Sequence, residues 1–170
     1  MKDWSKKRYW IVGASEGLGL ALAQKMSEAG ASLILTARNE ARLKEIASTL
    51  PNEVEVLPLD ITDLNAVRKS VKKLENVDGF VFLAGAYWPM PAQHWDIEKL
   101  TAMIDVNLIG ALHTLDVILP IFLEKNRGHL VFTGSLAGYR GLPGALGYGS
   151  SKAAIANLSE TLCFDLKDTA

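Results

Sequence analysis

Short apolar segments alternate with longer amphipathic segments along the chain. Apolar runs bounded by Gly, Pro or charged residues are typical of β-strands, and they cover Tyr9–Val12, Ser32–Ala37, Val54–Leu57, Gly79–Leu83 and His129–Thr133. Apolar residues spaced three or four positions apart are typical of helices, and they cover Leu18–Ala29, Glu40–Leu50, Asp63–Leu74, Ile97–Glu124 and Tyr148–Asp168. We expect the long fourth helix to bend near Asn107–Gly110.

The order of these elements predicts the fold class. Strands that alternate with helices over short connections form right-handed crossovers, which build a doubly wound parallel sheet with helices on both faces. The strands are continuously apolar, as expected for parallel strands that are covered on both sides. No repeat, linker or low-complexity segment divides the chain, so we predict a Rossmann-like α/β structure with a single domain over residues 1–170.

A glycine-rich turn follows the first predicted strand. It reads Gly13-Ala14-Ser15-Glu16-Gly17-Leu18-Gly19, and an amphipathic helix comes directly after it. Glycines in such a turn let the backbone approach a pyrophosphate, and the helix N-terminus offers free N–H groups. This spacing also arises by chance, but its place between the first strand and the first helix favours nucleotide binding. The turn matches neither the common G-x-G-x-x-G fingerprint nor a P-loop.

The end of the second strand bears on the choice of nucleotide. An acidic residue there accepts the ribose 2′-OH of NAD in many dinucleotide-binding folds, but this sequence reads Thr36-Ala37-Arg38. Because an arginine can pair with a 2′-phosphate, we favour NADP(H), with NAD(H) as the alternative. Glu16 opposes this choice, since it lies in the turn close to where that phosphate would bind. Arg38 can also be read as a solvated residue at the start of the next helix.

The last predicted helix opens with a pair of residues suited to proton transfer. Tyr148 and Lys152 are four residues apart and therefore share one helix face. A neighbouring ammonium favours the phenolate form of a tyrosine, which allows a phenol to act as an acid or a base. Ser135 follows the fifth predicted strand. Ligands of parallel α/β sheets bind at the C-terminal ends of the strands, so we expect Ser135 to lie near this pair and near the glycine turn.

Taken together, these motifs resemble the short-chain dehydrogenase/reductase family. The resemblance runs through the whole chain and rests on the order and spacing of Gly13-x-x-x-Gly17-x-Gly19, Asp60 in Leu59-Asp60-Ile61-Thr62, Ala84-Gly85, Asn107 in Val106-Asn107-Leu108, Ser135 in Gly-Ser-x-Ala-Gly, and Tyr148-x-x-x-Lys152. It implies a nicotinamide-dependent oxidoreductase that interconverts the carbonyl and hydroxyl forms of a small-molecule substrate. It also implies a homodimer or homotetramer.

The resemblance assigns roles to individual residues. Tyr148 would be the general acid in reduction and the general base in oxidation, and Ser135 would hydrogen-bond the substrate oxygen. Lys152 would favour the phenolate and hold the nicotinamide ribose, while Asn107 would hold a water in the proton relay behind it. The residues expected to contact the cofactor are Gly13, Ser15, Glu16, Gly17, Leu18, Gly19, Arg38, Asp60, Ile61, Ala84, Gly85, Tyr148 and Lys152.

The sequence departs from the family pattern in two places. The usual Asn-Asn-Ala-Gly after the fourth strand is Phe82-Leu83-Ala84-Gly85 here, which keeps the small residues and loses the side-chain amides. Family members also continue past the last helix with two further strands and a substrate-covering segment, whereas this sequence stops at Ala170. We expect a continuation that the sequence omits, with a true short form as the alternative. In the sequence as it stands, the fifth strand should be an exposed sheet edge.

Composition narrows the picture only slightly. A net charge of −1 gives no electrostatic case for nucleic acid or an anionic membrane. No apolar run has the length of a signal peptide or a membrane helix, so the cytoplasm is the expected location. The three histidines share no ligand-like spacing, and the single cysteine, Cys163, is interpreted as buried packing in the last helix. We therefore predict no metal site.

The sequence leaves two questions open, which are the class of function and the polarity of the substrate. A sugar-nucleotide epimerase or dehydratase shares the Tyr and Lys pair but usually has G-x-x-G-x-x-G in its first turn, which this chain does not match. A non-catalytic nucleotide-sensing or partner-binding protein of the same fold would not need Ser135, Tyr148 and Lys152, although the early end of the chain favours it. Trp88 and Met90, after the fourth strand, predict a fairly apolar substrate if they line a pocket; loop packing is the other interpretation.

Overall fold

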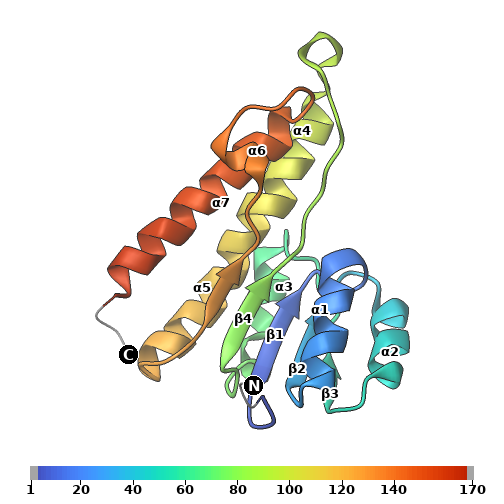
Figure 1. Cartoon of the computed structure of the whole chain (residues 1–170), viewed down its shortest axis with the longest axis vertical. Helices are drawn as coiled ribbons and strands as arrows, with labels where there is room; N and C mark the ends of the chain where they lie inside the picture. Colours follow the sequence, from blue (N-terminus) through green and yellow to red (C-terminus); the bar gives the residue numbers. More distant parts are fainter. Residues whose placement is uncertain (1–3, 168–170) are drawn as a thin grey trace.

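Five parallel strands form one sheet in the computed structural model, which describes residues 4–167 (Figure 1). The strands are Arg8–Val12 (β1), Ser32–Thr36 (β2), Val54–Val56 (β3), Gly79–Phe82 (β4) and Leu130–Phe132 (β5). Their order across the sheet is β3-β2-β1-β4-β5. The chain therefore builds outward from β1 on one side and resumes at β4 on the other, which leaves a crevice at the C-terminal ends of β1 and β4. The predicted doubly wound α/β fold is confirmed.

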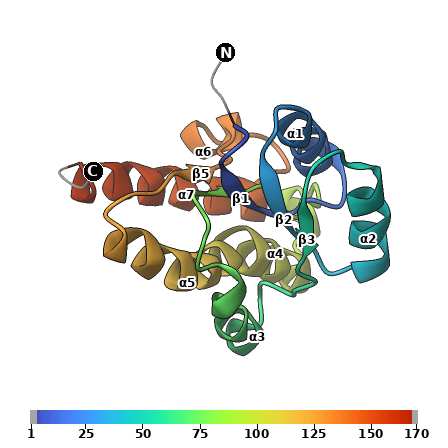
Figure 2. The same ribbon diagram turned by 90° about the horizontal axis from the view of Figure 1, so that it is seen from below.

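Helices connect the strands and cover both faces of the sheet (Figure 2). They are Gly17–Glu28 (α1), Glu40–Thr49 (α2), Leu64–Lys69 (α3), Ile97–Ile104 (α4), Gly110–Glu124 (α5), Leu136–Tyr139 (α6) and Leu146–Asp165 (α7), with short 3-10 turns at Val71–Lys73 (η1) and Ala92–His94 (η2) and a π-helical segment at Asp105–Ile109 (η3). The short elements α6 and η2 were not predicted. The predicted end of the last helix, Asp168, lies outside the described residues.

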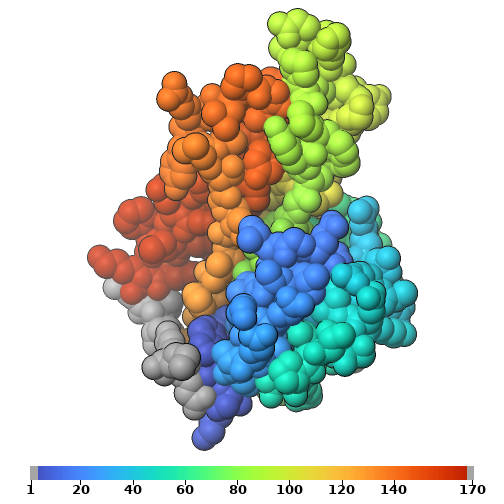
Figure 3. Space-filling view, turned by 45° about the vertical axis from the view of Figure 1, so that its right-hand side comes forward, coloured from blue at the N-terminus to red at the C-terminus, as the bar shows by residue number. Residues whose placement is uncertain are grey.

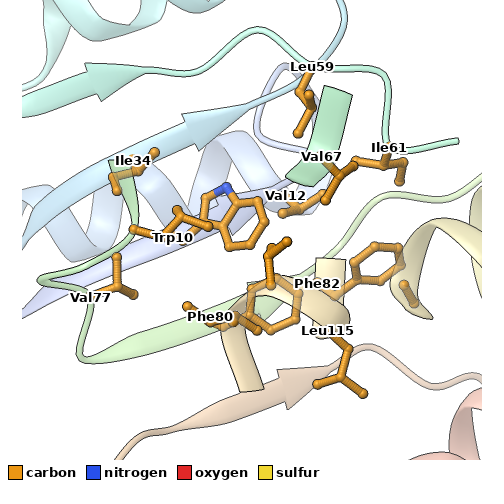
Figure 4. Close-up of a cluster of buried hydrophobic side chains, with 14 of the residues drawn as sticks. Trp10, Val12, Ile34, Leu59, Ile61, Val67, Val77, Phe80, Phe82 and Leu115 are labelled. Atoms are coloured by element: carbon orange, nitrogen blue, oxygen red, sulfur yellow. The ribbon is translucent and has the colours of Figure 1, made fainter. Parts of the chain in front are cut away.

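Alternate residues of β1 explain why its apolar run is continuous. Trp10 and Val12 pack on one face of the sheet with residues of α3, α5 and α7, and the Trp10 ring lies against Phe80 with ring centroids 5.1 Å apart and planes tilted by 55° (Figure 4). Tyr9 and Ile11 pack on the opposite face with residues of α1 and α2. A parallel strand between two helical layers is buried on both sides, so neither set of side chains is polar.

The predicted long helix is one helical run over residues 97–124, and η3 interrupts it where the bend was expected. A π-helical turn widens a helix locally and is frequent at functional sites. By length and composition alone this run could cross a membrane, which the sequence interpretation had not anticipated. In this fold it is a helix of the α/β sandwich, because α5 contributes Leu115, Ile118 and Phe122 to the core.

The last helix differs from expectation at its cysteine. Cys163 is exposed, so its interpretation as buried packing is wrong. The side of α7 that packs on the core carries Ile155 and Leu162, and residue 163 is turned about 100° from residue 162 around the helix axis. Strand β5 forms one edge of the sheet in the described chain, as expected.

Candidate active site

A cleft of about 920 Å³ opens at the C-terminal ends of β1, β2 and β4. In Figure 3 the turn after β1 lies below the segment that follows β4, shown in blue and green. The wall of the cleft includes these residues that the sequence assigned to the cofactor: Gly13, Ser15, Glu16, Gly17, Leu18, Gly19, Arg38, Asp60, Ile61, Ala84 and Gly85. Tyr148 and Lys152 lie outside this wall, on α7.

The three glycines of the turn meet different surroundings. Gly13 has φ +91°, and a Cβ there would lie 2.5 Å from the backbone nitrogen of Ala84. A Cβ on Gly19 would lie 2.8 Å from the carbonyl carbon of Gly13. Gly17 has φ +54° and no atom within 4 Å of where its Cβ would be. Two glycines therefore allow the turn to pack closely, and the third leaves an open backbone surface in the cleft, which fits the approach of a phosphate.

The start of α1 also fits an anionic group. Asn39, Asp63 and Asp96 cap α2, α3 and α4 with side-chain hydrogen bonds, whereas Glu16, the residue before α1, makes no such bond. The first N–H groups of a helix have no partner within the helix and carry the positive end of its dipole. At α1 these groups lie at the cleft, beside Gly17.

Thr36 is the last residue of β2, and it carries a hydroxyl where a carboxylate would bind the ribose of NAD. Its carbonyl oxygen accepts a hydrogen bond of 2.8 Å from the Gly13 N–H. Its hydroxyl accepts a hydrogen bond of 2.8 Å from the indole N–H of Trp10, inside the core. The end of the strand therefore ties the glycine turn to the sheet, and no acidic side chain stands at the position that would receive a ribose 2′-OH.

Arg38 and Asp60 bring opposite charges to the same end of the cleft. The Asp60 carboxylate accepts hydrogen bonds from the backbone N–H and the hydroxyl of Thr62, at 2.9 and 2.7 Å. These bonds, with a smaller contribution from the charge of Arg38, hold the pKa of Asp60 below its usual range. Asp60 is therefore a fixed acceptor, and Arg38 is an exposed cation on the cleft wall.

Tyr148 and Lys152 lie together near the start of α7. The Lys152 Nζ is 5.8 Å from the centre of the Tyr148 ring and donates a hydrogen bond of 2.8 Å to the Thr133 carbonyl. Burial lowers the pKa of Lys152, which is only 4% exposed. The Ser135 hydroxyl accepts from the Ala137 N–H at 3.2 Å at the start of α6. Within residues 4–167, Ser135, Tyr148 and Lys152 make no direct side-chain hydrogen bond with one another.

Asn107 is fully buried in η3 and connects two segments of the site. Its side-chain oxygen accepts from the Ala86 N–H at 2.7 Å, and its amide nitrogen donates to the Ala86 carbonyl at 3.0 Å. The same nitrogen donates to the Ser151 hydroxyl at 3.0 Å. Protein groups thus occupy three of the four hydrogen-bonding positions of the amide. Neither Ala86 nor Ser151 was predicted as a site residue from the sequence, although Ser151 lies inside the Tyr148-x-x-x-Lys152 motif.

Tyr87 joins the cleft to α7. It lines the cleft, and its ring lies 4.7 Å from the ring of Tyr148, centre to centre, at an angle of 49°. The segment after β4 therefore contacts Tyr148 through Tyr87. Asn107 holds the residue before Tyr87, which is Ala86. In the described part of the chain, no cluster of three or more His, Cys, Asp or Glu side chains could hold a metal ion.

Known proteins resemble this chain in sequence and in fold. The family model for short chain dehydrogenases matches residues 7–170. The chain is 34% identical over 163 residues to an uncharacterised oxidoreductase of Staphylococcus epidermidis, covering 94% of this chain and 71% of that protein. It is 38% identical over 167 residues to sulfoacetaldehyde reductase 2 of Chromohalobacter salexigens, covering 94% and 66% of the two chains. A closed serine dehydrogenase complexed with NADP+ matches with a TM-score of 0.90 at 29% identity, covering 95% of this chain and 67% of that one.

A parallel sheet with a glycine turn at its crevice defines a nucleotide-binding α/β protein, and the Tyr–Lys pair beside that crevice indicates an oxidoreductase. The chain belongs to the short-chain dehydrogenase family. The matched relatives are longer than this chain, which spans 71% of the Staphylococcus protein.

Proposed function

We propose that this protein transfers a hydride between NADP(H) and a carbonyl or hydroxyl substrate. The observation that carries the proposal is the position of Tyr148, whose ring contacts Tyr87 of the cleft and lies beside the ammonium of Lys152. A phenol next to a buried ammonium, at the end of a cleft that fits a nucleotide, suits proton exchange with a carbonyl oxygen.

The residues have complementary tasks in this proposal. When bound, the nicotinamide supplies or accepts the hydride. The Tyr148 hydroxyl donates its proton to the carbonyl oxygen in reduction and recovers it in oxidation. The Ser135 hydroxyl donates a hydrogen bond to the same oxygen and stabilises the charge that develops there; its bond with Ala137 uses the oxygen and leaves the hydrogen available. The ammonium of Lys152, which lies beside the Tyr148 ring, offers a donor to the ribose.

The preference for NADP(H) over NAD(H) rests on the end of β2. The strand ends at Thr36 and Ala37 follows, so no carboxylate there repels a 2′-phosphate, and Arg38 lies on the cleft wall to pair with one. Glu16 also lines the cleft and opposes this preference. A solved relative at 29% identity was complexed with NADP+, which supports the proposal by similarity.

We also propose a fairly apolar substrate. Large apolar side chains are exposed on the segments after β4 and β5: Tyr87 and Trp88 on the first, and Leu136, Tyr139 and Leu142 on the second. Met90 does not belong to this surface, because it is 3% exposed and its N–H donates to the Gly144 carbonyl between the two segments. Of the two residues considered after the fourth strand, Trp88 is therefore the one that can meet a substrate.

The remaining expectations extend the proposal by family similarity. We propose a homodimer or homotetramer, a cytoplasmic location, and a single dinucleotide-binding and catalytic domain over residues 1–170. The exposed Leu112 and Leu123 on α5 and Phe164 on α7 are apolar positions at which a second copy could pack.

The experiment that tests the proposed function is Tyr148→Phe, measured as NADPH oxidation with a panel of ketones and aldehydes. Loss of the general acid should reduce turnover by about 10²- to 10⁴-fold, while NADPH binding should persist. Tyr139→Phe is the matched control, because Tyr139 is 80% exposed and the change removes only a hydroxyl with no assigned task while keeping the ring on the proposed substrate surface. Unchanged turnover in Tyr148→Phe would refute the mechanism, and NADPH binding by the unmodified chain without turnover of any substrate would favour the nucleotide-sensing alternative.

A further inference from the structure

Two adjacent serines in α7 have different surroundings. The Ser150 hydroxyl is exposed and donates to the Leu146 carbonyl at 2.8 Å. Ser151 is fully buried, and its hydroxyl donates to the Tyr148 carbonyl at 2.8 Å and accepts from the Asn107 amide at 3.0 Å. A bond to a carbonyl one turn earlier is ordinary for a serine within a helix. The bond from Asn107 is what distinguishes Ser151 from its neighbour.

Asn107 continues this chain of hydrogen bonds to the cofactor cleft. Its amide binds both backbone groups of Ala86, which lines the cleft. The path therefore runs from Ala86 through Asn107 and Ser151 to the backbone of Tyr148. Both side chains on the path have no exposed surface, so water cannot replace a bond that is lost.

We propose that Ser151 is a positioning residue, which fixes the first turns of α7, and with them the Tyr148 phenol, against Asn107 and the cleft segment at Ala86. This inference rests on the proposed role of Tyr148 as proton donor. Within residues 4–167 the Tyr148 hydroxyl itself makes no hydrogen bond, and its ring lies against Tyr87 and beside the Lys152 ammonium. The position of the phenol therefore depends on the backbone that carries it.

The first test compares Ser151→Ala with Ser150→Ala in NADPH-dependent turnover. Because Ser151→Ala leaves the buried Asn107 amide without one partner, kcat should fall by about tenfold, while KM for NADPH stays within about twofold. Ser150→Ala should match the unmodified protein in both constants. Ser151→Cys keeps the size of the side chain with a weaker donor and acceptor, so it should recover part of kcat. A fall in kcat that is equal in the two alanine variants would overturn the proposal.

The second test does not require turnover and follows amide hydrogen exchange by NMR. The Ala86 N–H is bound by Asn107, whereas the Leu83 N–H donates to the Val12 carbonyl at the sheet, at 2.8 Å. In Ser151→Ala, exchange at Ala86 should accelerate by about tenfold with Leu83 unchanged, since only the local hydrogen bond is weakened. Equal acceleration at both amides would show general destabilisation and would overturn the proposal, as would no change at Ala86.

The ring carbon signals of the tyrosines provide a third measurement. The chain has four tyrosines, and the signal of Tyr148 is assigned by its loss in Tyr148→Phe. We expect this signal to move in Ser151→Ala and to stay in place in Ser150→Ala; an unmoved signal in Ser151→Ala contradicts the positioning role. If the unmodified protein binds NADPH without turning over any substrate, the proposed function fails, while Ala86 exchange and the Tyr148 signal still decide the role of Ser151.

Discussion

Gly17 and Gly19 lie two residues apart in the cofactor turn, and alanine at each should act through a different mechanism. Gly17 has φ +54°, and a Cβ there would meet no atom within 4 Å. Gly19 carries no positive φ, but its Cβ would overlap the Gly13 carbonyl, with the carbonyl carbon at 2.8 Å. Gly17→Ala therefore introduces backbone strain without a clash, whereas Gly19→Ala forces α1 away from the turn.

The two magnitudes differ enough to be separated. A left-handed conformation costs an L-residue about 1–2 kcal/mol. At about 3 °C per kcal/mol for a chain of this size, Gly17→Ala should lower Tm by about 3–6 °C. Overpacking costs about 1–3 kcal/mol where side chains can adjust. The atoms that Gly19→Ala would meet belong to the backbone, so we expect a loss at the top of that range or above, and a fall in Tm of about 9 °C or more.

The assay is thermal unfolding with and without NADPH, together with a direct titration. The added methyl in Gly17→Ala occupies the open surface of the turn, so it should weaken NADPH binding by about tenfold or more through the loss of a phosphate contact. Gly141→Ala is the control, because a Cβ there meets nothing within 4 Å and no positive φ is involved. A Gly19→Ala protein that melts at or above Gly17→Ala would refute the steric argument. Unchanged NADPH affinity in Gly17→Ala would refute the placement of the phosphate.

Three further substitutions test the charge and packing of the site. Burial lowers the pKa of Lys152. At pH values between that lowered pKa and about 10.5, Lys152 holds its proton in the unfolded chain but not in the folded one. The stability of the folded chain therefore rises with pH across this window. Lys152→Met should therefore raise Tm near neutral pH, with a gain that shrinks as pH approaches 10.5; a gain that grows with pH would contradict this sign. Trp10→Phe leaves the Thr36 hydroxyl without its buried donor and should cost about 2 kcal/mol in urea unfolding, whereas a loss below about 0.5 kcal/mol would not fit. Arg38→Ser should weaken NADPH binding about tenfold and leave NADH binding within about twofold; equal losses for the two nucleotides would remove the case for a 2′-phosphate site.

Much of the fold could be predicted because most elements depend on residues that are close together in the sequence. The apolar run at β1 and the period of α2 each depend on neighbouring residues, and both elements appear within one residue of the expected bounds. Short elements were harder. The single turn α6 depends on Ser135 capping a segment between β5 and α7, and its sequence has no helical period to detect. Cys163 was expected to be buried because apolar residues surround it in the last helix, and only packing shows which face of that helix is covered.

The candidate site divides in the same way. The glycine turn and the Tyr148–Lys152 pair are short-range motifs, so spacing alone placed the members of each motif beside one another. The sequence could not show that Asn107 meets Ala86, 21 residues away, and Ser151, 44 residues away. It also could not separate Ser151 from Ser150, which are the same residue type at adjacent positions of one helix. Hydrogen bonding and burial at such positions depend on how α7 packs against η3, and only the tertiary structure decides that.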